Sequence, residues 1–276
     1  MTAVAVVTGV FASERILEPD FAYPKTVLKS ADSLYEVSVR SGDVLGQLEA
    51  LMLSNESKSL IDRDTRPESI KRVLTVASGV KDRQMHALFD IYAAKLVSNY
   101  YRSNSWKFNQ RDLPLTPRPA DMSEWSGGMF NTVIDSLCQR AWDNAGDMPL
   151  TTLTRVIEAD RLTLQYFPTL SDFVASVISD VTSYDSNLNK WILKEALERS
   201  KPGSPRFYYL LEKQMEREGK KAVDYADTFM KAEDNYTRWC CGGLSVSNFP
   251  RTITVRIRIF CCLRLKKPSG SAETVG

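Results

Sequence analysis

The sequence predicts a mainly α-helical protein: a two-lobed helical body with a short extended N-terminal arm and a basic C-terminal tail that is either β or disordered. Apolar side chains recur at three- and four-residue spacing through most of the body. Prolines and capping residues separate these stretches. After Trp239 the charge, the cysteine content and the periodicity all change. The chain has 276 residues, 43% hydrophobic and 25% charged, which is typical of a globular protein with a sizeable core.

These patterns divide the chain into five segments. The Val-rich stretch 3–11 suggests a strand or an extended arm. The stretch DLPLTPRPA contains three prolines, so it cannot be a helix interior, and we interpret it as an extended linker between the lobes. In chain order, the arm, first lobe, linker, second lobe and tail are 1–30, 31–111, 112–120, 121–238 and 239–276.

Three helices are expected in the first lobe. An amphipathic pattern predicts a short helix over 44–52. Thr65 followed by Glu68 is a capping box, with Pro67 in the first turn and Gly79 as the stop, so the next helix should begin at Thr65. A third helix is expected over about 82–102, with one apolar face formed by Met85, Leu88, Phe89, Tyr92, Leu96, Val97 and Tyr100.

The second lobe should also be helical. Its clearest apolar stripe follows Ser123 and comprises Phe130, Val133, Ile134, Leu137, Cys138, Ala141 and Trp142. Ser204 followed by Pro205 is a strong helix start. Further helices are expected at about 151–166, 170–183, 186–199, 205–218 and 220–237.

The tail differs from the body in charge. Residues 239–276 contain six basic residues and one acidic residue, hence +5, and this leaves −3 for 1–238 in a chain of net charge +2. Residues 252–260 alternate strictly, which predicts a strand with one apolar and one basic face. The side chains that would make this tail a membrane or electrostatic surface are Arg256, Arg258, Cys261, Cys262, Arg264, Lys266 and Lys267.

Three interpretations of the tail stay open. Its strand would add to a sheet edge in a partner subunit. Alternatively, Cys261 and Cys262 beside basic residues would carry acyl chains and anchor the protein to an anionic membrane surface. In the third interpretation the tail is a poorly ordered extension of the body. For the structure of the tail, we rank this third interpretation slightly ahead of the other two.

The sequence offers no catalytic, metal or cofactor signature. There is no glycine-rich phosphate loop, no nucleophile elbow and no HExxH. The pairs Cys240-Cys241 and Cys261-Cys262 lack the spacing of zinc ligands. The single histidine, His86, is expected on a helix off the main apolar stripe, where a structural role is the ordinary one. We therefore expect a non-enzymatic protein without a cofactor.

The expected cellular compartment is inferred from two sequence features: the N-terminal stretch and the length of the apolar runs. The start, MTAVAVVTGVFA, has no basic region before its short apolar run, so no secretory leader is expected. Nor is there an apolar run of about 18 residues that would span a membrane. We expect an intracellular protein, cytoplasmic, nuclear or packaged in a virion, whose five cysteines are thiols.

An aromatic and basic cluster lies beside the linker. Aromatic rings stack on unpaired bases while cations neutralise phosphates, so this mixture favours single-stranded RNA as a ligand. The alternative is that the rings pack at the edge of the lobe and the cations are solvated. The candidate residues are Tyr100, Tyr101, Arg102, Trp106, Lys107, Phe108, Arg111 and Arg118.

Two helical lobes joined by an extended segment, with cations near the joint, form a layout typical of viral nucleoproteins and capsid proteins, which we use as an architectural analogy only. The sequence thus predicts a structural protein of nucleocapsid or capsid type that forms homo-oligomers and binds single-stranded RNA. The alternative is a peripheral membrane or matrix-like helical scaffold anchored by the tail. A helical enzyme with an unrecognised site ranks third.

Overall fold

The computed structural model describes residues 21–111, 118–159, 164, 166–182 and 186–218, together with 256 and 257. It is mainly helical, which confirms the predicted fold class. The elements are α1 (Pro24–Ser41), α2 (Val44–Ile61), η1 (Arg63–Thr65), α3 (Arg66–Ser78), α4 (Arg83–Ser103), α5 (Ser105–Phe108), η2 (Met122–Glu124), α6 (Gly127–Ala145), η3 (Leu150–Leu153), β1 (Ile157–Glu158), α8 (Leu170–Val181), α9 (Asn187–Arg199), α10 (Pro205–Arg217) and β2 (Arg256–Ile257).

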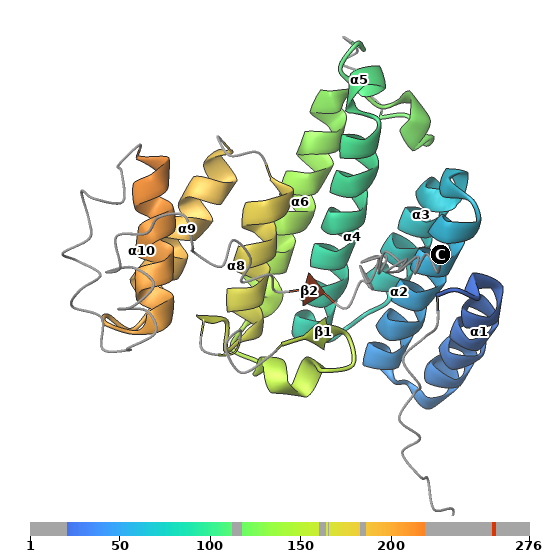
Figure 1. Cartoon of the computed structure of the whole chain (residues 1–276), viewed down its shortest axis with the longest axis horizontal. Coiled ribbons are helices and arrows are strands. Elements are labelled where there is room, and N and C mark those ends of the chain that lie inside the picture. Colours follow the sequence, from blue (N-terminus) through green and yellow to red (C-terminus); the bar gives the residue numbers. More distant parts are fainter. Residues whose placement is uncertain are drawn as a thin grey trace, which may run out of the picture.

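The helices α4 and α6 lie side by side at the centre, with α1–α3 on one side and α8–α10 on the other (Figure 1). The whole predicted stripe of α6 is buried, as the sequence predicts. One apolar cluster runs from Leu48 of α2 through α4 and α6 to Leu210 of α10, so the core is continuous across the predicted linker. The division into two lobes stays a prediction.

An ion pair between a buried carboxylate and a half-exposed arginine helps to join the central helices. Asp90 of α4 has no exposed surface, and both of its carboxylate oxygens accept hydrogen bonds from Arg140 of α6, at 3.1 and 2.6 Å. A carboxylate that far from water needs such a partner, because its desolvation is otherwise uncompensated. Asp90 and Arg140 therefore link α4 to α6.

The first lobe contains more helix than predicted. α1 begins at Pro24, inside the segment predicted as an arm, and α2 continues to Ile61, well past position 52. Gly42 joins the two helices in the left-handed conformation, with φ of 71°. This conformation favours glycine, which has no Cβ to clash. Asp43 then caps α2 by accepting a hydrogen bond from the amide of Gly46.

Helix α3 begins directly after Thr65, as predicted, with Pro67 in its first turn, but the predicted capping box is wrong. Thr65 has helical dihedrals, and its hydroxyl donates to the carbonyl of Asp62 at 2.7 Å instead of capping α3. The Asp62 carboxylate accepts from the amide of Asp64 and starts the short turn η1, which leads directly into α3. The predicted stop at Gly79 is confirmed.

The predicted helix over 151–166 is wrong for its first part, because residues 150–158 form the turn η3 and the two-residue strand β1. Residues 160–163 and 165 lie outside the described residues. The amide of Leu150 donates to the carbonyl of Pro168, and Arg155 donates to the carboxylates of Asp43 and Glu49 on α2. These tertiary bonds outweigh the helix-like apolar spacing of the segment.

Strand β1 pairs with a part of the tail. Ile157 lies opposite Ile257 and Glu158 opposite Arg256 in an antiparallel register. The strand predicted over 252–260 stays a prediction. The predictions for 3–11, 220–237 and the rest of the tail lie outside the described residues, as does 112–117 of the linker.

The remaining second-lobe helices agree with the sequence. α8, α9 and α10 lie within the predicted ranges or within a residue or two of them. Ser204 accepts a hydrogen bond from the amide of Phe207 at 3.2 Å, which confirms it as the cap of α10. The core is thus set by helices whose ends are locally encoded.

Candidate nucleic-acid interface

The predicted aromatic and basic cluster lies at the end of α4, where α5 folds back (Figure 1). Asn104 makes this turn: its amide donates to the carbonyl of Tyr101, and its side chain donates to the carbonyl of Tyr100 at 3.0 Å. Two positions on the short α5 then face opposite ways. Phe108 is 1% exposed, whereas Trp106 is 71% exposed.

Most of the rings in the cluster pack on one another. Phe130 of α6 is at the centre, with ring centroids 4.6 Å from Phe108, 5.3 Å from Tyr101 and 5.1 Å from Trp125. Tyr100 packs on the same group, 5.6 Å from Phe108. The buried ring of Phe108 is therefore closed to a base, and Tyr100 and Tyr101 are held in place by packing.

The cations of the cluster divide into two groups. Arg111 donates to the carbonyls of Ser123 and Trp125, and Arg118 stacks on the Trp125 ring at 4.8 Å, so both hold the chain around η2. Arg102 donates to the carbonyl of Asp180 and is otherwise exposed, and Lys107 is exposed beside Trp106.

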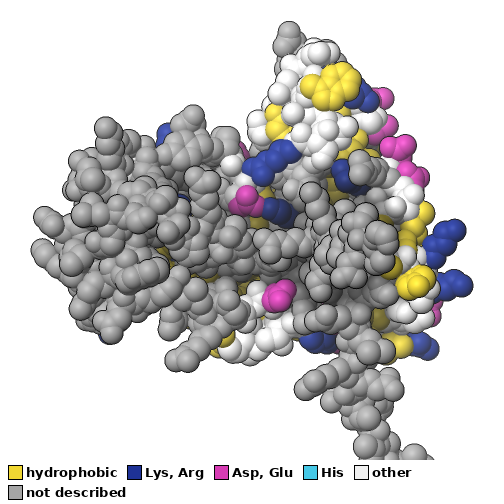
Figure 2. All heavy atoms as spheres, in the orientation of Figure 1, with side chains coloured by type: hydrophobic (Ala, Val, Ile, Leu, Met, Phe, Trp, Pro, Cys, Tyr) yellow, Lys and Arg dark blue, Asp and Glu magenta, His cyan; other side chains and the backbone are white. Residues whose placement is uncertain are grey.

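Hydrophobic and basic side chains are exposed together at this end of the molecule (Figure 2). The surroundings also contain acids. Hydrogen bonds from Ser123 lower the pKa of Asp121, and the charges of Lys71 and Lys107 lower it further. The candidate interface therefore contains both charges: the acid Asp121, and the cation Lys107 directly beside Trp106.

Next to this end, a cavity of about 320 Å³ lies between α2, α3 and α4. Its lining includes two residues of the predicted cluster, Tyr100 and Arg102, together with Asn55, Glu56, Arg66 and Tyr92. Arg66 on α3 reaches across to α4, where it donates to the hydroxyl of Ser103 at 3.4 Å. The structure thus places a polar hollow directly beside the aromatic and basic surface.

The cavity contains polar groups that are poorly solvated. The side-chain amide of Asn55 donates to the hydroxyl of Tyr92 at 3.1 Å, while its Oδ1 is buried without a donor. Burial raises the pKa of Glu56, although the charge of Arg66 opposes this, and burial likewise raises the pKa of Tyr92. Sequence reasoning missed this group because its members come from three helices.

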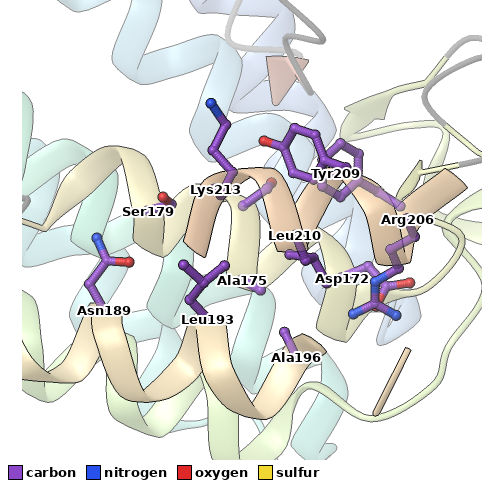
Figure 3. A pocket seen from close by; sticks show the side chains of 12 residues that line it. Asp172, Ala175, Ser179, Asn189, Leu193, Ala196, Arg206, Tyr209, Leu210 and Lys213 are labelled. Atoms are coloured by element: carbon purple, nitrogen blue, oxygen red, sulfur yellow. The ribbon is translucent and has the colours of Figure 1, made fainter. Parts of the chain in front are cut away.

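A second hollow, of only about 20 Å³, lies between α8, α9 and α10. Figure 3 shows the carboxylate of Asp172 beside the guanidinium of Arg206 there. Asp172 also completes a capping box with Thr169 at the start of α8. The hollow has room for a water molecule, so we assign this ion pair a structural role.

His86 and Cys138 do not lie in an arrangement that suggests catalysis. His86 Nδ1 lies 3.0 Å from Asp90 Oδ2, on the carboxylate that Arg140 already holds. Burial raises the pKa of the Cys138 thiol, which makes it a poor nucleophile. Within the described ranges no three His, Cys, Asp or Glu side chains are grouped to hold a metal ion.

The tail residues give no surface to describe. Arg256 is described only as part of β2, and Arg258, Cys261, Cys262, Arg264, Lys266 and Lys267 lie outside the described residues. In the part of the chain that the structure covers, every helix is too short or too polar to cross a bilayer.

Comparison of the chain with protein-family models, with curated proteins and with solved structures finds no match in any of the three. A functional assignment for this chain must therefore come from its own residues and their geometry.

Proposed function

We propose that this chain is a non-enzymatic structural protein of nucleocapsid or capsid type, which binds single-stranded RNA and self-associates. One observation carries the proposal: the indole of Trp106 is 71% exposed at the α4–α5 end, directly beside the exposed Lys107. An exposed aromatic ring offers a stacking platform for any base, because every base has a π face. The adjacent ammonium group is placed to neutralise a phosphate of the same strand.

The surrounding charges support a strand that continues past Trp106. Arg102 is exposed one turn before α5 and lines the neighbouring cavity. Residues 99–118 contain four basic residues and one acidic residue, in a body whose net charge is negative. The local excess of positive charge would guide an RNA strand to this end of the molecule.

Self-association has separate support from the first two helices. Large apolar side chains are exposed on or next to α1 and at the end of α2: Tyr23, Val37, Val39, Leu60 and Ile61. Contact between subunits would remove them from water. We expect sedimentation velocity to show larger assemblies when RNA is added, and a monomer at all RNA concentrations would contradict this part of the proposal.

The RNA site is tested with two matched double variants. Trp106→Ala with Lys107→Glu removes the exposed ring and reverses the charge at the α4–α5 end. Lys190→Glu with Trp191→Ala does the same to an exposed Lys-Trp pair on α9. We expect the first variant to weaken binding of single-stranded RNA and to flatten its salt dependence, because fewer counterions are released.

The α9 variant should lose less affinity than the α4–α5 variant. Equal losses in both variants, or no loss in the first, would contradict the assignment of the interface. Flotation with anionic vesicles and no affinity for RNA would instead favour the alternative, a membrane-surface scaffold anchored by the tail.

A further inference from the structure

We propose that the cavity between α2, α3 and α4 is a pocket for one nucleotide, with the base against Asn55 and Glu56 and the phosphate between Arg66 and Arg102. This pocket would add a base-specific site to the proposed RNA interface. The proposal rests on the proposed function in one respect, because a bound RNA strand would supply the nucleotide. The pocket itself is argued from volume, buried acceptors and placed cations.

The volume fits a small ligand. At about 320 Å³ the cavity lies at the lower end of the range for small-molecule sites, about 300–1,000 Å³. The side chains of Ile70 and Leu96 supply apolar walls, and Tyr100 adds an aromatic one. Apolar and aromatic walls around a few polar groups are the usual environment of a bound base.

The inner part of the cavity presents hydrogen-bond acceptors. Asn55 is 6% exposed, its amide nitrogen is used by Tyr92, and its Oδ1 has no donor. Buried polar atoms in folded proteins are nearly always partnered, so a ligand or water with an N–H or O–H group is expected here. Glu56 is the next residue on α2, and its carboxylate is a second acceptor in the same cavity.

The cations come from two other helices. Arg66 projects from α3 and Arg102 from α4, and both line the cavity. Each guanidinium has five N–H groups, of which the contacts to Ser103 and to the carbonyl of Asp180 occupy only part. Guanidinium groups bind phosphate through pairs of parallel hydrogen bonds, so two of them can hold one phosphate monoester.

This arrangement predicts a base preference. Two acceptors are complementary to a base edge that presents N–H donors. The Watson–Crick edge of guanine presents a ring N–H and an exocyclic amine side by side, while adenine and cytosine present one amine. Uracil presents a single ring N–H between two carbonyl oxygens. At least one of these carbonyl acceptors would face the acceptors Asn55 Oδ1 and Glu56, which is unfavourable. We expect GMP to bind most tightly and UMP most weakly.

The test is equilibrium dialysis of the full chain against GMP, AMP, CMP and UMP. Asn55→Leu should remove the preference for GMP and weaken its binding about tenfold or more, because the base loses its acceptor. Arg66→Gln should weaken all four nucleotides by a similar factor, because it removes a phosphate contact. As a control, Arg83→Gln changes an exposed arginine at the opposite end of α4, about 28 Å along the helix axis, and should change nothing.

The outcomes separate the pocket from the proposed function. Absence of nucleotide binding in the wild-type chain overturns the pocket, and RNA binding that persists then leaves the proposed function intact. Nucleotide binding without RNA binding supports the pocket as a site for free nucleotides and counts against the proposed function. UMP binding as tight as GMP overturns the assigned base orientation. Circular dichroism shows whether Asn55→Leu folds, and if it does not, Arg66→Gln still decides.

Displacement of bound GMP by single-stranded RNA distinguishes the two sources of the ligand. If RNA displaces GMP in the wild-type chain, the pocket takes a nucleotide of the strand. If GMP and RNA bind independently, the pocket is a site for free nucleotides, and the clause that links it to the RNA interface is wrong.

Discussion

The buried ion pair between Asp172 of α8 and Arg206 of α10 gives the sharpest stability prediction. Burial raises the pKa of the Asp172 carboxyl above its ordinary value of 3.8, although Arg206 opposes the shift, and burial lowers the pKa of Arg206. Desolvation is thus the larger effect on the pKa of each group, and the opposite charge of the partner acts against it. A carboxyl with a raised folded-state pKa stabilises the folded state at low pH, and this contribution is lost as the pH rises through that pKa.

Replacing Arg206 with Met should make the protein's stability more sensitive to pH. Asp172 keeps its burial but loses the main opposing charge, so its pKa should rise further. The carboxyl can escape an unpaired charge by binding a proton. For an ordinary Asp this costs about 1.36 kcal/mol for each pH unit above 3.8. The electrostatic cost of Arg206→Met therefore has an upper limit of about 4.4 kcal/mol at pH 7 and about 1.6 kcal/mol at pH 5.

Urea unfolding at pH 5, 6 and 7 measures this directly. The free energy of unfolding lost on Arg206→Met should shrink between pH 7 and pH 5 by up to about 2.7 kcal/mol. The control is the same substitution in an Asp172→Asn background, where Asn retains an oxygen for the amide of Thr169 but cannot ionise. There the cost should be independent of pH. An equal cost at pH 5 and pH 7 in the wild-type background would refute the reasoning.

Three further predictions concern the core and the tail. Phe130→Ala should cost about 3–5 kcal/mol of unfolding free energy, because four aromatic rings pack on it, and an unchanged denaturant midpoint would contradict the packing. Arg140→Met should cost about 1–3 kcal/mol, because the buried Asp90 loses its two hydrogen bonds to Arg140 and keeps only its contact with His86, and Asp90→Leu in the same chain should restore most of it. Deleting residues 239–276 should leave the helical circular dichroism signal in place and weaken RNA binding without abolishing it, since the net charge falls to −3, and an unfolded product would show that the tail is integral to the core.

The candidate interface shows how much of a site a sequence can indicate. The mixture of rings and cations in 99–111 lies at one end of α4, but the sequence does not indicate which of these side chains are accessible. Trp106 and Phe108 are two positions apart, and only the packing of Phe108 on Phe130 decides which of them is buried. The cavity gave no sequence signal, because Asn55 and Tyr92 meet across 37 positions and each looks ordinary on its own helix.

The sequence alone determined the existence of α3, α4, α6 and α8–α10 and several of their ends, since apolar spacing, Ser204 before Pro205 and the stop at Gly79 act within a few residues. Tertiary structure decided the rest. It drew 150–158 into a turn and a strand despite helical spacing, because Arg155 and the amide of Leu150 bond to distant elements. It also paired Asp90 with Arg140 and enclosed Asn55, because a buried polar group takes its partner from whichever helix packs against it.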